Sequence, residues 1–309
     1  MDVLQHFNLK ELPFSLTPNL EFFCPLRNHS NAIDTLLFHL DAGESLIKVI
    51  GEVGTGKTLL CRKLLHSLAD KDFITCYIPN PDLDKESLRR FVASELGYES
   101  DDQGKQFDVI EHIYHMLIEH HRAGKKVVLV VDESQVLSDE GIETIRLLTN
   151  LETEKHKLLQ IVLFGQPELD ENLSTPQLRQ VRQRINFSYY LEPLTQDEME
   201  HYVSKRLLKA GHPTGQIFDK DAAKLLYKAS GGIPRVIHTL TYKAMLITWE
   251  EQQHKITKKI MKETIALSED VYTNDPRDIL RKWVYGACFV VAFCIVCYML
   301  YTLWNDFYR

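Results

Sequence analysis

The sequence of 309 residues lacks an excess of positive charge. It contains 36 lysines and arginines against 43 aspartates and glutamates, which gives a formal net charge of −7. Proteins that bind nucleic acid usually carry a basic patch or stripe. This balance therefore argues against nucleic acid as a partner. The content of hydrophobic residues, 44%, and of charged residues, 26%, is typical of a globular protein.

Cysteines are few, and their spacing fits neither a disulfide framework nor a metal site. Of the six, three are scattered over residues 24–76 and three lie in an apolar stretch near the C-terminus. This usage indicates a reducing compartment. Cys294 and Cys297 have the spacing of a redox motif, but no strand-turn-helix pattern surrounds them. Apolar packing or chance is the simpler interpretation.

The sequence also lacks internal repeats and low-complexity stretches. The N-terminal residues MDVLQHFNLKELPF contain no basic segment followed by an apolar one. We therefore expect no cleavable signal peptide.

Short apolar runs alternate with helical patterns up to about residue 193. We expect strands at residues 45–50, 73–78, 126–131, 158–164 and 185–191. We expect helices at residues 59–69, 86–96, 108–121, 139–151 and 176–184. Strands that alternate with helices predict a parallel sheet with crossover helices.

From Pro193 onwards the pattern is helical. Thr195 and Glu198 fit a capping box at the start of the first helix, and Gly211 suits its end. The predicted organisation is a core at 1–193, a small helical domain at 194–268, a polar linker at 269–282, an apolar helix at 283–304 and a short tail at 305–309.

The segment GEVGTGKT carries the clearest chemical motif. It matches G-x-x-x-x-G-K-[ST] and lies between an expected strand and an expected helix, as that motif requires. Its glycines let backbone N–H groups point at phosphates, and the next helix adds its positive N-terminal end. Lys57 is expected to bind the β- and γ-phosphates, and Thr58 to ligate Mg²⁺. The candidate nucleotide-binding residues are Gly51, Glu52, Val53, Gly54, Thr55, Gly56, Lys57 and Thr58.

An acidic pair follows the strand expected at 126–131. Asp132 is placed to hold Mg²⁺, usually through water, and Glu133 to polarise the attacking water. Parallel strands present their carboxyl ends on one edge of a sheet, so both acids can reach the phosphates at the loop around Lys57. The alternative is that the pair caps the helix expected at 139–151.

The order of these motifs resembles the AAA+ ATPases. Several segments resemble one subgroup of them, the general secretion pathway protein A ATPases and the related MSHA-pilus biogenesis proteins, over residues 1 to about 268. These segments are HFNLKELPFSLTP, GEVGTGKT, VVDESQ, IRLLTNLE, VLFGQPEL and GGIPR. The resemblance implies an α/β P-loop AAA+ fold, with a parallel-sheet core that has helices on both faces and a small all-α lid domain. We expect a C-terminal transmembrane helix after the lid, from the apolar segment described below. It also implies ATP with Mg²⁺ and assembly into a homo-oligomer.

The resemblance assigns further roles. Gln166 occupies the sensor-1 place, with a turn residue before a proline as the alternative. Arg184 resembles an arginine finger that acts on a neighbouring subunit's nucleotide; Arg179 and Arg182 are rivals for that role, and a solvated basic face is the alternative. Arg235 resembles sensor 2, a role that would explain a cation in the first turn of a helix, where it is otherwise disfavoured.

Two weaker patterns lie elsewhere. Phe14 and His29 resemble the segment that lines the adenine pocket, although an aromatic residue after proline is usually core. One helical face has metal-ligand residue types at spacings of three and four, although a solvated face is the simpler interpretation. Its members are Glu111, His112, His115 and Glu119.

The segment 283–304 contains no aspartate, glutamate, lysine or arginine. As a helix it would extend about 33 Å, enough to cross a hydrocarbon core of about 30 Å. A buried core helix is the alternative. Basic residues precede the segment at Arg277, Arg281 and Lys282, and only Arg309 follows. The positive-inside rule then predicts a single-pass inner-membrane protein with its ATPase domain in the cytoplasm.

The function that fits best is a membrane-anchored ATPase that assists assembly of a type IV pilus or a type II secretion apparatus, with pilus or secretion proteins of the inner membrane as partners. Five residues after the apolar segment are too few for the periplasmic region of general secretion pathway protein A, which favours the pilus relative. A DNA-dependent helper ATPase and a nucleotide-switched scaffold are the alternatives.

Overall fold

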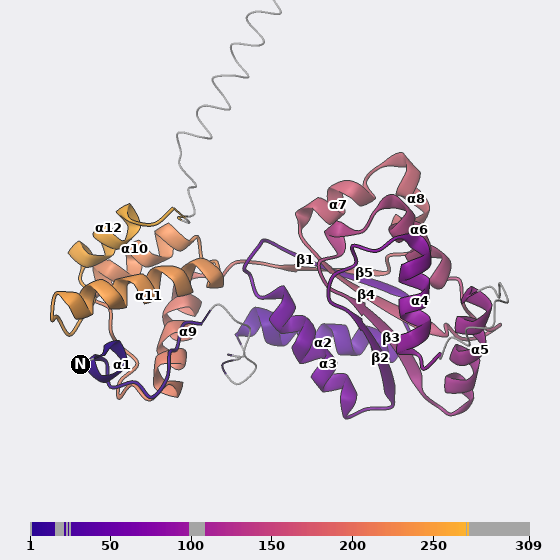
Figure 1. The fold of residues 1–309 in the computed structure, drawn as a ribbon, viewed down its shortest axis with the longest axis horizontal. Helices are drawn as coiled ribbons and strands as arrows, with labels where there is room; N and C mark the ends of the chain where they lie inside the picture. The colour runs from indigo at the N-terminus through magenta and orange to yellow at the C-terminus, as the bar shows by residue number, and fades with distance from the viewer. Residues whose placement is uncertain are drawn as a thin grey trace, which may run out of the picture.

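The computed structural model describes residues 2–15, 22, 24, 26–98, 109–269 and 271. The described chain forms two lobes, a core that contains a sheet and a lid made of helices (Figure 1). The sheet has five strands, all parallel, in the order β2-β3-β4-β1-β5. They are β1 (Leu46–Gly51), β2 (Phe73–Ile78), β3 (Lys126–Val131), β4 (Leu159–Gly165) and β5 (Phe187–Leu191). The predicted parallel sheet is confirmed, with strand ends shifted by one or two residues.

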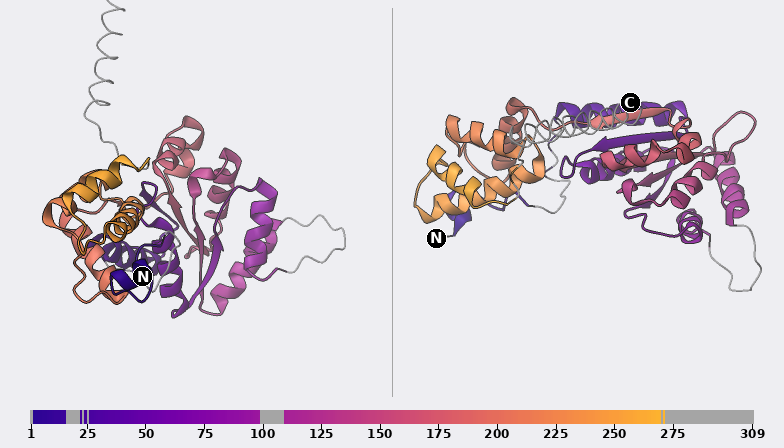
Figure 2. Two further views of the ribbon diagram at one scale, coloured as in Figure 1. Left: turned by 60° about the vertical axis from the view of Figure 1, so that its left-hand side comes forward. Right: turned by 90° about the horizontal axis from the view of Figure 1, so that it is seen from above.

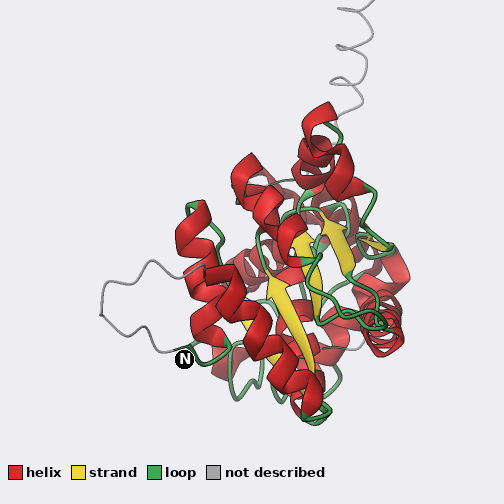
Figure 3. Ribbon diagram, turned by 90° about the vertical axis from the view of Figure 1, so that its right-hand side faces the viewer, coloured by secondary structure: helices red, strands yellow, loops and turns green. Residues whose placement is uncertain are grey.

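Helices cover both faces of the sheet (Figure 3). On one face lie α2 (Arg27–Ala42) and α3 (Lys57–Ala69), and on the other α4 (Lys85–Glu95), α5 (Val109–Arg122) and α6 (Asp139–Leu148). Successive residues of a strand point to opposite faces. Val128 and Val130 of β3 therefore pack under α2 and α3, whereas Leu129 packs under the other layer. A strand with two covered faces is apolar at almost every position, which explains the run VVLVV after the exposed Lys126.

Two connections differ from the sequence-based expectations. Ser138 caps α6, because its side chain accepts a hydrogen bond from Gly141 N–H, so the acidic pair Asp132–Glu133 does not cap this helix. The helix expected at 176–184 is a 3-10 turn, η3 (Pro176–Leu178), followed by the single turn α8 (Arg179–Arg182). Leu178, the last residue of η3, has φ −96° and ψ 13°, outside helical geometry, which separates the two turns.

The lid consists of α9 (Gln196–Lys209), α10 (Lys220–Ser230), α11 (Pro234–Glu250) and α12 (Lys258–Ala266). The capping box of Thr195 and Glu198 is present at the start of α9. Apolar side chains from all four helices form one buried cluster, which stabilises the lid. The turn between α10 and α11 packs on the segment that joins β5 to α9, since Leu194 N–H donates to Gly232 O at 2.9 Å.

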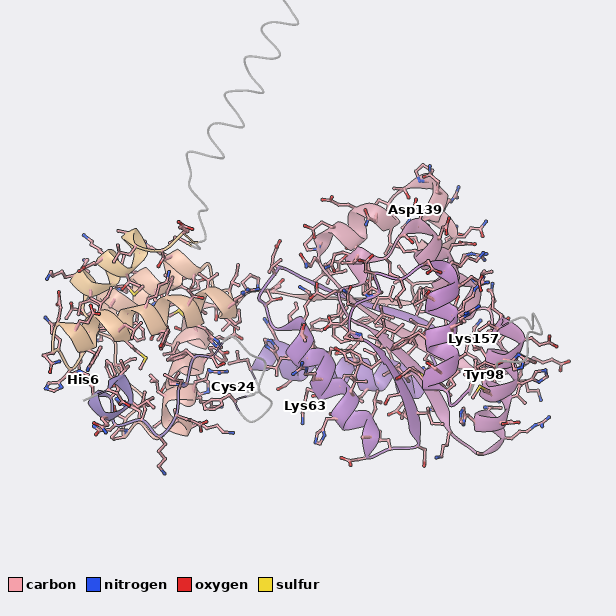
Figure 4. The ribbon with its side chains drawn as sticks, viewed as in Figure 1. His6, Cys24, Lys63, Tyr98, Asp139 and Lys157 are labelled. Carbon is pink, nitrogen blue, oxygen red and sulfur yellow. The ribbon has the colours of Figure 1, made fainter. Side chains whose placement is uncertain are left out.

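The N-terminal segment packs with the lid, although the core follows it in the chain. The short helix α1 (Val3–His6) lies beside the lid helices in two views (Figures 1 and 2). Phe7, Phe14, Phe22 and Cys24 all belong to the lid's apolar cluster, and Cys24 is labelled on the lid side in Figure 4. The predicted domain boundary at residue 193 stays a prediction. It does not account for the packing of the N-terminal segment against the lid.

Within the residues that the structure describes, no helix is long and apolar enough to cross a membrane. The segment expected to do so, 283–304, lies outside those residues.

Candidate functional site: a cavity between core and lid

A cavity of about 290 Å³ lies where the lid meets the carboxyl ends of the strands. The core contributes the loop before α3, Glu133 after β3 and Gln166 after β4. The lid contributes Tyr202 of α9 and Arg235 and His238 of α11. Clefts at the carboxyl edge of a parallel sheet are the usual ligand sites of such folds, so the topology places this cavity where a ligand is expected.

The loop of residues 51–56 turns sharply at two glycines. Gly54 has φ +82° and Gly56 has φ +99°, values that glycine adopts without strain. His29 of α2 supports the loop from behind, with Nε2 at 3.2 Å from Thr55 O. A Cβ on Gly56 would meet the same His29 nitrogen at 3.1 Å. His29 therefore contacts the loop itself, and its place in an adenine pocket stays a prediction.

Lys57 is the first residue of α3 and is 5% exposed. Its Nζ donates to Gly51 O at 2.7 Å and to Glu52 O at 3.0 Å, so the ammonium lies inside the loop. Burial lowers the pKa of Lys57, and the nearby carboxylates of Glu133 and Asp132 oppose that shift. The lysine therefore lies in an acidic, partly desolvated position.

Asp132 lies at the end of β3 and is 2% exposed. Burial raises the pKa of its carboxyl group, and hydrogen bonds from Glu133 N–H, at 3.0 Å, and from the Thr58 hydroxyl offset only part of that rise. The bond between Thr58 and Asp132 brings together the two oxygen ligands predicted for Mg²⁺. Carboxylate and hydroxyl oxygens are the hard ligands that this ion prefers.

Two glutamine amides surround the carboxylate of Glu133. Gln166 Nε2 donates to Glu133 Oε2 at 3.0 Å, so the predicted sensor residue faces the cavity. Its side chain makes no capping bond to α7 (Pro167–Leu173). Gln135 also donates to Glu133, at 2.6 Å. Sequence reasoning assigned no role to Gln135, although the segment VVDESQ that suggested the family contains it.

Arg235 lies in the first turn of α11, directly against the loop. Its N–H donates to Gly54 O at 3.2 Å, and a Cβ on Gly54 would lie 2.6 Å from Arg235 Cβ. The lid and the phosphate-binding loop are therefore in backbone contact at this point. The side chain of Arg235 is exposed and lines the cavity.

A buried polar chain joins the lid to the N-terminal segment. Arg206 donates through Nε to Pro13 O at 2.7 Å and through Nη1 to Phe22 O and the Tyr202 hydroxyl, both at 3.2 Å. The Tyr202 hydroxyl lies 2.7 Å from Nε2 of His238.

The other ring nitrogen of His238, Nδ1, lies 3.0 Å from Ser15 O. A carbonyl oxygen only accepts, so Nδ1 carries the proton and Nε2 accepts from Tyr202. Burial and the charge of Arg206 lower the pKa of His238 to about 3. No sequence motif pointed to this chain of groups.

Several predicted residues lie elsewhere. Arg184 is half-buried before β5 and is not among the residues that line the cavity. Arg179 and Arg182 are exposed. Phe14 is buried against His238, at 5.6 Å between ring centroids, and belongs to the lid's apolar cluster.

The helical face with metal-ligand residue types is solvated. His115 and Glu111 of α5 approach to 3.9 Å with both side chains about two-thirds exposed. In the described ranges there is no group of histidine, cysteine, aspartate or glutamate residues that could hold a metal. The interpretation as a solvated face fits this arrangement.

Known proteins share this architecture. A family model described as AAA domain matches residues 40–173. General secretion pathway protein A of Aeromonas hydrophila is 41% identical over 256 residues, a match that covers 82% of this chain and 46% of that relative. The chain thus matches a little under half of that relative's length.

Solved structures with 14–20% identity share the fold. The Aeropyrum pernix ORC2 protein, in ADPNP and ADP complexes, has a TM-score of 0.59 over 84% of this chain and 72% of that chain, at 14% identity. Cdc6p of Pyrobaculum aerophilum has a TM-score of 0.60 over 82% and 69%, at 20% identity. The Thermotoga maritima RuvB Holliday junction branch migration motor has a TM-score of 0.52 over 83% and 73%, at 16% identity.

The parallel sheet, the glycine loop before α3 and the acidic pair after β3 define a nucleotide-binding P-loop protein of the AAA class, a class of ATP-hydrolysing enzymes. Within this class, the chain belongs to the AAA+ ATPase family of general secretion pathway protein A.

Proposed function

We propose that this chain is a membrane-anchored ATPase that uses ATP hydrolysis to assist assembly of a type IV pilus or a type II secretion apparatus. The observation that carries the catalytic part is the convergence of Lys57, Thr58, Glu133, Gln166 and Arg235 on one cavity between core and lid. Asp132 is hydrogen-bonded to Thr58 beside this cavity. The family match supports the cellular part.

The loop and the helix behind it bind the triphosphate. Backbone N–H groups of the loop and of the first turn of α3 point at the anion, and Lys57 Nζ exchanges its bonds to Gly51 O and Glu52 O for phosphate oxygens. Mg²⁺, when bound, neutralises charge on the phosphates, and Thr58 and Asp132 are the residues that would hold it.

Glu133 then accepts a hydrogen bond from the attacking water and orients it, with Gln166 beside it. Arg235 contacts the loop through its backbone, and its side chain lines the cavity. In the proposed sensor-2 role, this side chain binds the γ-phosphate and links its loss to movement of the lid. We infer that Arg184 acts in a homo-oligomer, on the nucleotide of the neighbouring subunit, because it lies outside the cavity of its own chain.

The segment 283–304 is the proposed anchor in the inner membrane, with the ATPase in the cytoplasm. Proteins of the pilus or secretion machinery are the proposed partners, and lid movement relative to the core is the motion that would act on them.

The decisive variant is Glu133→Gln in the purified full-length chain in detergent. We expect its turnover to fall about 100-fold or more, because a general base contributes rate of that order, while affinity for ATP stays within about threefold of wild type. Glu263→Gln, at an exposed position of α12, is the matched control and should hydrolyse ATP like wild type. Unchanged turnover in Glu133→Gln would remove Glu133 from the mechanism.

The cellular role is tested with the same variant in native membranes. Glu133→Gln should accumulate with bound ATP, and crosslinking should capture pilus or secretion components in greater yield than from Glu263→Gln. A chain found only in the aqueous fraction after lysis would contradict the anchor.

The alternatives predict other outcomes. A DNA-dependent helper would show turnover that DNA stimulates and that salt strongly reduces. The likeness to DNA-acting proteins does not favour it, because at 14–20% identity it reflects the fold alone. Complementation of a deletion strain by Glu133→Gln would favour a nucleotide-switched scaffold.

A further inference from the structure

Glu133 has an unusual backbone conformation, and its carboxylate accepts a hydrogen bond from the side-chain amide of Gln135, two residues later. Its φ is +50°, in the left-handed region that residues other than glycine rarely adopt. It caps the 3-10 turn η2 (Ser134–Val136), in which Val136 N–H donates to Glu133 O at 3.0 Å. The hydroxyl of Ser134 fixes this turn by donating to Val131 O at 3.0 Å. Such conformations persist where the surroundings hold them, and they cluster at functional sites.

The two ends of the Gln135 amide have different partners. Its Nε2 donates to Glu133 Oε2 at 2.6 Å, and its Oε1 accepts from Gln166 N–H at 3.1 Å. Gln166 Nε2 donates to the same Oε2 of Glu133 at 3.0 Å. Gln135 thus links the end of β3 to the end of β4 at the edge of the cavity.

Both amides bind one oxygen of the Glu133 carboxylate. Across the described part of the chain, Oε1 of Glu133 has no hydrogen-bond partner. A glutamate side chain has three rotatable covalent bonds. The hydrogen bonds from Gln135 and Gln166 restrict rotation about them. An amide donor keeps the carboxylate anionic and leaves its second oxygen as an acceptor.

We propose that Gln135 is a positioning residue for ATP hydrolysis. It holds Oε2 of Glu133 so that Oε1 faces the attacking water, and its bond to the backbone of Gln166 fixes Gln166 beside Glu133. The proposal rests on the proposed function, in which Glu133 orients that water. A misplacement of about 1 Å in such a group costs on the order of 100-fold in rate. Gln135 touches neither nucleotide nor water in this account; it acts through Glu133.

A purely structural role is the competing explanation. The bond from Gln166 N–H to Gln135 Oε1 could simply anchor the turn between β4 and α7. Two variants separate the explanations. Gln135→Leu removes both ends of the amide, whereas Gln135→Glu keeps an acceptor for Gln166 and loses the donor to Glu133.

The experiment is a double-mutant cycle on the full-length chain in detergent. Single-turnover ATP hydrolysis is measured for wild type, Gln135→Leu, Glu133→Gln and the combined variant, and affinity for a fluorescent ADP analogue is measured for each. We expect Gln135→Leu to lower the rate about 10- to 100-fold with nucleotide affinity unchanged. In the Glu133→Gln background the same change should alter the residual rate less than about twofold, because its effect passes through Glu133.

Gln135→Glu should have the low rate of Gln135→Leu. Its carboxylate would lie against that of Glu133, so its unfolding midpoint should be lower than that of wild type. Gln216→Leu, at an exposed position of the lid, is the control and should retain full turnover. Wild-type turnover in Gln135→Glu, or an equal loss in both backgrounds of the cycle, overturns the role of Gln135 and leaves the proposed ATPase intact. A wild-type protein that binds nucleotide without hydrolysing it overturns both.

Discussion

His238 is a buried, neutral histidine, and its state makes the stability of the lid depend on pH. It is 8% exposed, it donates to Ser15 O and it accepts from the Tyr202 hydroxyl. Burial and the positive charge of Arg206 lower its pKa from 6.5 to about 3. Protonation would break the bond from Tyr202 and place a second cation beside Arg206. Between pH 6.5 and about 3, His238 is therefore neutral in the folded lid and protonated in the unfolded chain.

The magnitude follows from the two pKa values. Because the folded pKa lies below the unfolded one, the unfolded state binds more protons between pH 6.5 and about 3, and stability falls as the pH falls through that window. From pH 7 to pH 5 His238 alone should lower the free energy of unfolding by about 2 kcal/mol. The variant His238→Gln has no such proton to gain, so its stability should fall less over the same interval.

The assay is urea denaturation at pH 7 and at pH 5, followed by the fluorescence of Trp249, which lies on α11 with His238. Trp283 and Trp304 are replaced by phenylalanine in both proteins, so that the signal reports the lid alone. The loss of stability between the two pH values should be about 2 kcal/mol larger for the parent than for His238→Gln. Parallel losses would refute the conclusion that His238 is held neutral.

Three further predictions test the packing. Gly232→Ala should cost roughly 3 kcal/mol or more in urea denaturation, because φ is +74° and its Cβ would lie 2.1 Å from Leu194 O; Gly124→Ala, at φ +76° in open space, should cost only about 1 kcal/mol. Ser138→Ala should cost about 1 kcal/mol through the lost cap, and an unchanged urea midpoint would contradict that role. Arg206→Met should speed protease cleavage of the N-terminal segment, and wild-type cleavage rates would show that its carbonyl contacts do not hold the segment.

The sheet and the phosphate-binding loop could be predicted from the sequence because their signals are local. A strand buried on both faces requires an uninterrupted apolar run, and β3 has one. The loop requires glycine at its turns, and Gly54 and Gly56 both have positive φ. The helix expected at 176–184 failed because apolar spacing alone does not show where one turn ends and the next begins.

The sequence predicted the main residues of the candidate site but not the residue that positions Glu133. Lys57, Asp132 and Glu133 belong to motifs whose spacing carries the chemistry, and Gln166 and Arg235 came from resemblance. The sequence assigned no role to Gln135. Its hydrogen bond to Glu133 occurs where Glu133 has a left-handed backbone conformation, and the residue types there do not predict that conformation.

By itself, the sequence determined the order of strands and helices, the loop that binds phosphate and the acidic pair that follows β3, since each depends on residues within a few positions of one another. Only the tertiary structure decided that the N-terminal segment belongs to the lid, through carbonyls that Arg206 and His238 bind from almost two hundred residues or more away. It also decided that Glu133 lies between two amides. Contacts of this kind depend on the path of the whole chain, and residue spacing does not encode them.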